Sequence, residues 1–168
     1  MIDTPSPTIQ LLDQDGVAFT LDKVSTNYVL VYFYPKDMTP GCTTQACAIE
    51  QAWSTLAKLG CSVIGISRDS PKRHRQFIDK YQLPFPLLSD PEGEICQAFG
   101  VWIEKSMFGK RYMGIERSSF LLDSDRIIRK AWRKVKPAEH IDLVIDYLVQ
   151  HSSDTTWPLL QRGADRLY

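Results

Sequence analysis

The sequence contains no apolar run long enough to cross a membrane. The longest such run, residues 28–34, has seven residues, whereas a membrane-spanning helix needs about 20. The first ten residues also lack the apolar stretch of about 7 to 15 residues that a secretory signal requires. We therefore expect a soluble, cytoplasmic protein with no membrane partner.

An excess of charge of one sign is also absent. The 20 Lys and Arg residues balance 20 Asp and Glu residues in a chain of 168, so the formal net charge is +0. Proteins that bind nucleic acid usually carry a basic surface. The basic stretch at residues 129–136 alternates with apolar residues, in the manner of a strand with one solvated face. We expect no nucleic-acid partner.

Cysteines are too few for a disulfide scaffold in a chain of this length. The four are Cys42, Cys47, Cys61 and Cys96. A structural zinc site needs a second pair of ligands, which Cys61 and Cys96 do not form, and the three histidines stand apart. The first two cysteines have four residues between them, rather than the two of a dithiol redox motif. We expect no metal and no other cofactor.

Strand-like and helix-like segments alternate, which predicts one α/β domain with helices on both faces of its sheet. Residues 28–34 are β-branched and aromatic without alternation, as in a strand buried on both faces, and residues 61–67 form a second such strand. Ser70 followed by Pro71 predicts a helix that runs to about Gln82. A last helix is expected to begin near Pro137.

The other expected elements are shorter. They are a hairpin of residues 9–12 and 17–21, a helix from Cys42 to a cap at Gly60, a short edge segment after residues 83–88, a short helix within 91–99, an irregular loop over 102–114, and a hairpin of residues 118–122 and 127–133. We expect the domain to span residues 1–150. Residues 151–168 are polar and form a C-terminal tail of unknown role.

Residues 34–47, YPKDMTPGCTTQAC, are where chemistry is expected. A buried strand runs into a loop, and the loop delivers Cys42 to the first turn of a helix. The unpaired N–H groups and the dipole of a helix N-terminus favour a thiolate, the nucleophilic form of cysteine. Thr39 supplies a hydroxyl nearby, and Pro40 stiffens the approach and excludes water. The alternative for Cys42 is a buried core cysteine.

Four segments occur in order along the chain: YFYPKDMTPGCTTQAC, PFPLLSDPEGEICQAFGVW, YMGIERSSFLLD and RKAWRKVKP. Together they resemble the peroxiredoxins of the bacterioferritin-comigratory-protein, or Q-type, branch, over residues 3–148, which is 146 of 168 residues. The resemblance implies a thioredoxin-like fold, a central mixed sheet flanked by helices, with an N-terminal hairpin extension. It also implies an antioxidant, thiol-dependent reduction of hydrogen peroxide and organic hydroperoxides, in a branch that is mostly monomeric.

The resemblance assigns roles to five residues. Cys42 matches the peroxidatic cysteine, and Cys47 matches the resolving cysteine that many members carry five residues further on. Thr39 matches the hydroxyl that hydrogen-bonds the bound peroxide, and Pro40 matches the proline that shields the sulfur. Arg117 matches the arginine that polarises the thiolate and the peroxide. The implied mechanism is an intramolecular disulfide that thioredoxin re-reduces.

Helix geometry adds one expectation. Five residues along an α-helix rise about 7.5 Å and turn about 140°, which leaves the two Cα atoms roughly 8.7 Å apart. A disulfide needs Cα atoms within about 7 Å of each other. If Cys42 and Cys47 share one regular helix, its first turns must unwind on oxidation and re-form on reduction.

Two other functions remain open at this point. One is a disulfide oxidoreductase for which peroxide is incidental. The other is a redox-responsive binding protein, in which oxidation of Cys42 unfolds the helix and exposes a partner surface. Only a peroxidase consumes peroxide catalytically. We expect Cys61 and Cys96 to be structural. Lys36 and Asp37 are expected at the loop surface, and a role in shaping the loop is the alternative.

Overall fold

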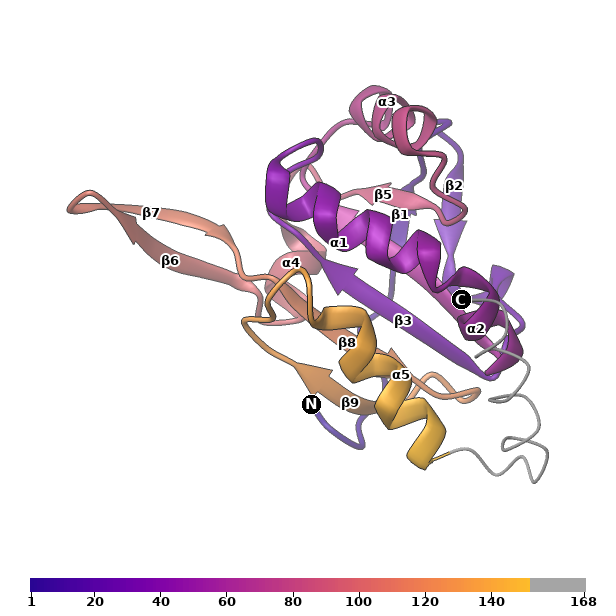
Figure 1. The fold of residues 1–168 in the computed structure, drawn as a ribbon. Coiled ribbons are helices and arrows are strands. Elements are labelled where there is room, and N and C mark those ends of the chain that lie inside the picture. The colour runs from indigo at the N-terminus through magenta and orange to yellow at the C-terminus, as the bar shows by residue number, and fades with distance from the viewer. Residues whose placement is uncertain (152–168) are drawn as a thin grey trace.

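The fold is that of a computed structural model in which residues 1–151 are described. Residues 152–168, almost all of the expected tail, lie outside the described residues. A seven-stranded mixed sheet forms the centre of the molecule, and a separate two-stranded sheet projects from it (Figure 1). The expected mixed sheet is therefore present.

The middle of the sheet is built from the most apolar segments of the chain. β3 (Tyr28–Phe33) lies between β4 (Cys61–Ser67), which runs parallel to it, and β8 (Ser118–Leu122), which runs antiparallel. Every residue of β3 after Tyr28 is buried. The prediction of a strand buried on both faces is confirmed.

Shorter strands continue the sheet on both sides. The order is β2 (Ala18–Thr20), β1 (Gln10–Leu12), β5 (Leu87–Ser89), β4, β3, β8 and β9 (Ile128–Trp132). The β1–β2 and β8–β9 hairpins form where the sequence predicts them. The prediction that β5 is an edge segment is wrong, because β1 pairs with its outer side through Leu12 and Ser89.

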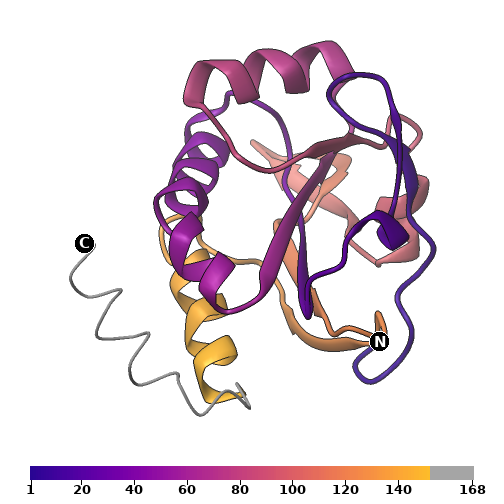
Figure 2. The ribbon, with the colours of Figure 1, turned by 90° about the vertical axis from the view of Figure 1, so that its right-hand side faces the viewer.

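Helices cover the sheet and enclose two apolar cores. They are α1 (Pro40–Gln51), α2 (Trp53–Lys58), α3 (Pro71–Tyr81), α4 (Glu94–Ala98) and α5 (His140–Gln150), with a short 3-10 helix at Leu21–Lys23. Helices α1, α2, α3 and α5 contribute to one core and α4 to the other. Figure 2 shows α1, α2 and α5 along one side of the sheet. Within residues 1–151, no helix has both the length and the apolar character needed to cross a bilayer.

Helix boundaries follow local sequence signals in part, since the single helix expected from Cys42 to Gly60 is divided at Ala52 into α1 and α2. Ser70 caps α3, since its hydroxyl accepts the N–H of Arg73 at 3.2 Å, as the Ser–Pro pair predicts. α1 begins at Pro40 rather than at Cys42, because proline suits the first position of a helix. α5 begins at His140, slightly later than the expected start near Pro137.

Residues 102–114 do not form the irregular loop that we expected. They form β6 (Trp102–Met107) and β7 (Lys110–Ile115), an antiparallel hairpin that extends away from the body (Figure 1). Phe108 and Gly109 make its two-residue turn with φ angles of 53° and 79°, the left-handed backbone that such a turn requires. Neither strand has a buried face whose alternation could mark it in the sequence.

The parallel strands β3 and β4 bring two loops together at their carboxyl ends. Residues 34–39 connect β3 to α1, and residues 68–70 connect β4 to α3. The backbone N–H of Asp37 in the first loop donates to Oδ2 of Asp69 in the second at 2.9 Å. Carboxyl ends of parallel strands are where α/β folds commonly place their binding sites.

Candidate active site

Cys42 lies in the first turn of α1. Thr39 is the N-cap residue, so Cys42 is the third residue of the helix. In the first intrahelical hydrogen bond, the N–H of Thr43 donates to the carbonyl of Thr39 at 2.9 Å. N–H groups ahead of that bond have no intrahelical acceptor. Cys42 is only 2% exposed. The sequence prediction for its position is confirmed.

Arg117 places its guanidinium against the Cys42 sulfur. Both terminal nitrogens, Nη1 and Nη2, donate to Sγ at 3.5 Å. Nη1 also donates to Oε1 of Gln45 at 2.7 Å, so a second residue of α1 orients the same group. The structure thus brings together two residues 75 positions apart that the sequence singled out. Gln45 was not singled out, because a glutamine on a helix carries no signal of its own.

The backbone around Arg117 is fixed by its neighbours. Arg117 lies between β7 and β8, and its carbonyl accepts the N–H of Val135 at 3.0 Å. Glu116 accepts from Ser118 Oγ at 2.7 Å and from Arg133 Nε at 2.6 Å. Burial alone would raise the pKa of Glu116, but these hydrogen bonds lower it below its usual value. The carboxylate therefore stays charged and holds the segment in place.

Gly41 allows the close approach of the guanidinium. A Cβ atom at this position would lie 3.2 Å from Nη2 of Arg117 and 3.4 Å from Cγ of Pro137. The first distance is shorter than an ordinary van der Waals contact, and the second is at its lower limit. A side chain here would push Arg117 away from the sulfur.

Thr39 and Pro40 stand at the entrance to this turn. The Thr39 hydroxyl does not cap α1, but donates to the Lys36 carbonyl at 2.8 Å. Its oxygen keeps lone pairs that can accept a hydrogen bond from a ligand. Pro40 occupies the first position of α1 and is exposed.

Cys47 lies further along α1 and is partly exposed. Burial, and then the nearby Glu50 carboxylate, raise the pKa of its thiol. All four cysteines are free thiols. Because Cys42 and Cys47 share one helix, the geometric condition for unwinding before disulfide formation is met.

Cys61 and Cys96 are both buried away from solvent. Burial raises the pKa of Cys61 to about 12. Burial, followed by the hydrogen bond and charge of Asp90, also raises the pKa of Cys96 strongly. Thiols held in the neutral form are poor nucleophiles. The prediction that these two cysteines are structural agrees with this placement.

A layer of buried polar atoms lies in the same region of the core. Tyr32 Oη, Gln45 Nε2 and His140 Nδ1 are buried, and none has a hydrogen-bond partner among the described residues. Nε2 of His140 and the hydroxyl of Ser119 are 2.5 Å apart. Burial, together with the positive charge of Arg117, lowers the pKa of His140 to about 4, so this imidazole is neutral at pH 7. The sequence offered no signal for this layer.

Asp37, Asp69 and His74 form the cluster of possible metal ligands found among residues 1–151. Their ligand atoms lie within 4.8 Å of one another, but protein groups already use them. His74 contacts Asp37 through Nδ1 and the Leu88 carbonyl through Nε2. Asp69 accepts from Ser67 and from the Asp37 backbone. The arrangement fits a hydrogen-bond network better than a metal site.

The burial of Asp37 corrects one expectation. Lys36 is exposed as expected, but Asp37 is only 1% exposed and faces away from solvent. A carboxylate tolerates such burial only when it is paired and hydrogen-bonded. Its partner, His74, is 37 residues further along, which is why the sequence did not reveal the pair.

A shallow cleft of about 380 Å³ opens beside the loop of residues 34–39. Lys36, Lys105, Tyr112 and Met113 are among the residues that line it. Burial, and then the nearby charge of Arg117, lower the pKa of Lys105. The cleft therefore offers both apolar surface and positive charge next to the Arg117 region.

A thiol in the first turn of a helix, with a guanidinium on its sulfur, is characteristic of the class of thiol-based redox enzymes. The chain belongs to the AhpC/TSA family, whose model matches residues 2–131. Within that family it is a peroxiredoxin of the Bcp, or Q, type, and so a thiol peroxidase, as the sequence resemblance predicts.

Two curated relatives are similar over most of their length. Peroxiredoxin Bcp of Escherichia coli (strain K12) is 46% identical over 147 residues, which is 88% of this chain and 94% of the relative. Peroxiredoxin Bcp of Bacillus subtilis (strain 168) is 45% identical over 140 residues, 83% and 89% of the two chains. The solved structure of Xanthomonas campestris Peroxiredoxin Q matches with a TM-score of 0.82 at 41% identity, covering 90% of this chain and 97% of that one. The thioredoxin-like peroxiredoxin fold is thereby confirmed.

Proposed function

We propose that the chain reduces hydrogen peroxide and organic hydroperoxides, with Cys42 as the peroxidatic thiol and Cys47 as the resolving thiol. The observation that carries the proposal is the contact of both Arg117 Nη atoms with the Cys42 sulfur, each at 3.5 Å. An arginine stays positively charged and offers several donors in one plane. It therefore supports a thiolate before the reaction and a charged oxygen during it.

In the first step, the Cys42 thiolate attacks one oxygen of the hydroperoxide and the O–O bond breaks. The sulfur is oxidised to a sulfenic acid, and the peroxide is reduced. The departing oxygen leaves as an alkoxide or hydroxide and takes up a proton to become an alcohol or water. Arg117 and the free N–H groups in the first turn of α1 stabilise the charge that builds on this oxygen.

Thr39 orients the hydroperoxide for this attack. Because its own proton is donated to the Lys36 carbonyl, its oxygen faces the substrate as an acceptor. The hydroperoxide O–H donates to that oxygen, which fixes the direction of the O–O bond. Pro40, exposed at the first position of α1, limits the access of water to the same turn.

In the second step, the Cys47 thiol condenses with the Cys42 sulfenic acid. A disulfide forms and one water molecule leaves. The first turns of α1 must unwind, because a regular helix holds the two Cα atoms about 8.7 Å apart and a disulfide spans about 7 Å. A dithiol protein of the thioredoxin type then reduces the disulfide, and α1 re-forms.

Several features of the substrate and setting complete the proposal. The alkyl peroxide reduction activity of Xanthomonas campestris bacterioferritin comigratory protein, 40% identical to this chain, supports organic hydroperoxides as substrates. A reducing, cytoplasmic compartment suits four free cysteines. We expect a monomer, with no resident cofactor and no nucleic acid or membrane as partner.

Intact mass after one equivalent of hydrogen peroxide, followed by peptide mapping, tests the proposal. A loss of about 2 Da with Cys42 joined to Cys47 is expected. A gain of about 16 Da confined to Cys42 would leave the peroxidatic role and remove the resolving role of Cys47. No selective change at Cys42 would contradict the proposal and favour a binding protein that responds to oxidation in another way.

Two matched variants separate the roles of the cysteines. Cys42→Ser should abolish peroxide turnover, whereas full turnover would refute the assignment. Cys47→Ser should retain one round of peroxide reduction and lose most turnover with thioredoxin. Cys61→Ser is the control, since a buried thiol that takes no part should leave turnover unchanged. A disulfide oxidoreductase would instead exchange disulfides at low protein concentration without consuming peroxide.

A further inference from the structure

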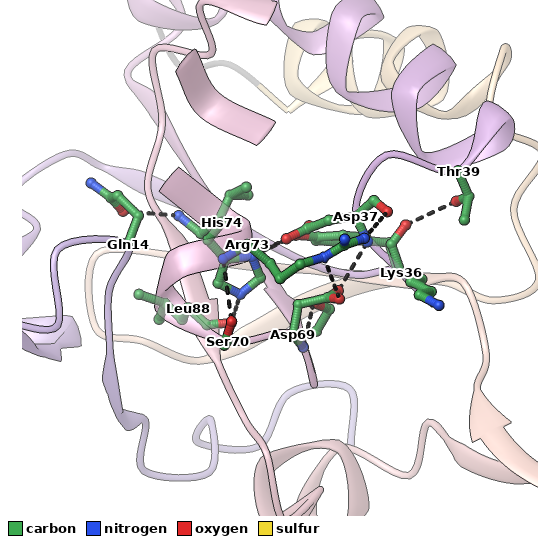
Figure 3. Close-up of polar contacts among 12 residues, drawn as sticks. Gln14, Lys36, Asp37, Thr39, Asp69, Ser70, Arg73, His74 and Leu88 are labelled. Carbon is green, nitrogen blue, oxygen red and sulfur yellow. Dashed lines mark hydrogen bonds and ion pairs between the residues drawn. The ribbon is translucent and has the colours of Figure 1, made fainter. Parts of the chain in front are cut away.

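We propose that the buried Asp37–His74 pair is a positioning device for the catalytic loop, and that it acts on the peroxide step through the Thr39 hydroxyl. The inference rests on the proposed function above. Both side chains are fully buried, that of Asp37 in the loop of residues 34–39 and that of His74 on α3. Figure 3 shows Asp37 between the His74 ring and the part of the loop that leads to Thr39.

The Asp37 carboxylate is held on both oxygens. Oδ2 lies 2.6 Å from Nδ1 of His74, and Oδ1 accepts the hydroxyl of Tyr34. Nε2 of His74 is 3.0 Å from the Leu88 carbonyl, which can only accept, so Nε2 carries a proton. The histidine thereby connects the loop before α1 to β5, which is separated from β3 by β4 alone in the sheet.

The Asp37 backbone is held as firmly as its side chain. Its N–H donates to Asp69 Oδ2 at 2.9 Å, and its carbonyl accepts from Nη2 of Arg73 at 3.4 Å. Met38, the next residue, has a φ of 64°, which is uncommon for a residue other than glycine. Such a conformation persists only where the surrounding structure imposes it. The contacts that hold Asp37 impose this backbone conformation on Met38.

One peptide unit transmits the position of Asp37 to Thr39. The peptide that joins Lys36 to Asp37 donates its N–H to Asp69 and accepts the Thr39 hydroxyl on its carbonyl at 2.8 Å. A peptide unit is planar, so fixing its N–H side also fixes the direction of its carbonyl. The orientation of the Thr39 hydroxyl therefore depends on how Asp37 is held, by Asp69 in the loop before α3 and by His74 on α3.

The contacts of Asp37 also divide the site into a part that moves with α1 and a part that does not. Unwinding of α1 would displace Cys42, which is held by contacts to Arg117. Asp37 is held by α3 and the loop before it, and these contacts do not involve α1. Thr39 therefore has a fixed reference when α1 re-forms after reduction.

Stopped-flow measurement of Cys42 oxidation by hydrogen peroxide tests the proposal. Asp37→Ala removes the carboxylate contacts and should lower the second-order rate constant by between about 10- and 100-fold, as displacement of a positioned group does. Asp37→Asn keeps an acceptor for Tyr34 and offers an N–H donor to His74, so it should restore most of the rate. The rate of disulfide formation from the sulfenic acid should stay within a few-fold in both variants.

A double-mutant cycle tests whether Asp37 acts through Thr39. Thr39→Val lowers the rate constant by removing the hydroxyl, and adding Asp37→Ala to it should cause little further loss. Two effects that multiply would show independent roles and overturn the proposal. An Asp37→Ala rate equal to that of the unmodified chain would also overturn it.

Two further variants guard against a loss of folding. Ile128→Ala creates a cavity in the other core and serves as a control of reduced stability. If its rate constant falls as far as that of Asp37→Ala, the positioning role is refuted. Should Asp37→Ala not fold, Asp69→Ala frees the N–H side of the same peptide unit and should give the same loss. A chain that forms no sulfenic acid at Cys42 would refute the proposed function itself, before any variant is compared.

Discussion

At the scale of single residues, the four thiols differ in what surrounds them. Cys42, Cys61 and Cys96 all belong to apolar cores, but Cys42 also touches the guanidinium of Arg117. Burial raises the pKa of Cys61 to about 12 and also raises that of Cys96. The thiolate is the reactive form. Chemical reactivity should therefore divide the cysteines into two groups.

Labelling with iodoacetamide measures this division. In the native, reduced chain, Cys42 and Cys47 should be labelled, while Cys61 and Cys96 should react only after denaturation. Peptide mass mapping over time follows each site, and the denatured chain, in which all four should react, is the control. Labelling of Cys96 in the native chain as fast as Cys42 would contradict the assignment.

Arg117 offers a second test at this scale. Arg117→Lys keeps a positive charge but loses the planar pair of donors that contacts the Cys42 sulfur. The rate constant for Cys42 oxidation should fall by about 10²- to 10³-fold, the effect of removing one donor from an oxyanion site. Arg75→Lys, in an exposed ion pair with Asp15 and Asp79, should leave the rate unchanged. An equal loss in both variants would argue against a direct role of Arg117.

At the scale of elements, α1 is built so that its two ends differ. Its first five residues include Gly41, Thr43 and Thr44, which are poor helix formers, whereas alanines follow at positions 46 and 48. The first turn is therefore the weaker part of the helix. The residues that must move for disulfide formation are those that are least costly to unfold.

Amide exchange across residues 43–49 tests this expectation. These amides should be protected in the reduced chain and should exchange faster once Cys42 and Cys47 are joined, because the helix bonds there are lost. Cys47→Ser treated with peroxide is the control and should stay protected. Equal protection in both redox states would exclude unwinding of α1.

Elements with a local signal were predictable from the sequence, and those without one were not. The apolar run of β3 and the Ser70–Pro71 start of α3 identified their elements correctly. The β6–β7 hairpin was missed because it has no buried face, and its turn is Phe108–Gly109 rather than a typical turn pair. Periodicity reports burial, so an exposed hairpin leaves little trace.

The site divides in the same way. Cys42, Thr39 and Cys47 lie on one contiguous motif, and the helix-forming residues that follow Cys42 predicted their place on α1 or directly before it. Arg117 was reached only through the family resemblance. Gln45 and the Asp37–His74 pair depend on contacts between distant segments, which a single sequence does not reveal.

At the scale of the whole molecule, one buried histidine links stability to pH. His140 lies at the start of α5, is fully buried, and has a pKa of about 4, below the ordinary 6.5. Above pH 6.5 neither the folded nor the unfolded state binds this proton. As the pH falls below 6.5, the unfolded state takes it up first, so stability decreases until the pH nears 4.

The size of this effect is measurable by urea unfolding at pH 7 and pH 4.5. A difference of this size in pKa corresponds to at most about 3 kcal/mol of stability lost on acidification. His140→Gln should remove much of that loss, while His151→Gln, at the exposed far end of α5, should not. An unchanged pH dependence in His140→Gln would show that the loss arises elsewhere.

The hydrogen bond from Thr39 to the Lys36 carbonyl has a consequence for selectivity among oxidants. Because the Thr39 hydroxyl already donates its hydrogen to that carbonyl, it can only accept a hydrogen bond from a ligand. The site therefore favours oxidants that carry an O–H donor. Hydroperoxides carry such a hydrogen, and dialkyl peroxides and disulfides do not. A site built to accept a hydrogen bond can reject an analogue that lacks the donor by about 10⁴-fold. tert-Butyl hydroperoxide should therefore oxidise Cys42 readily while di-tert-butyl peroxide leaves it reduced, a discrimination that Thr39→Val should weaken.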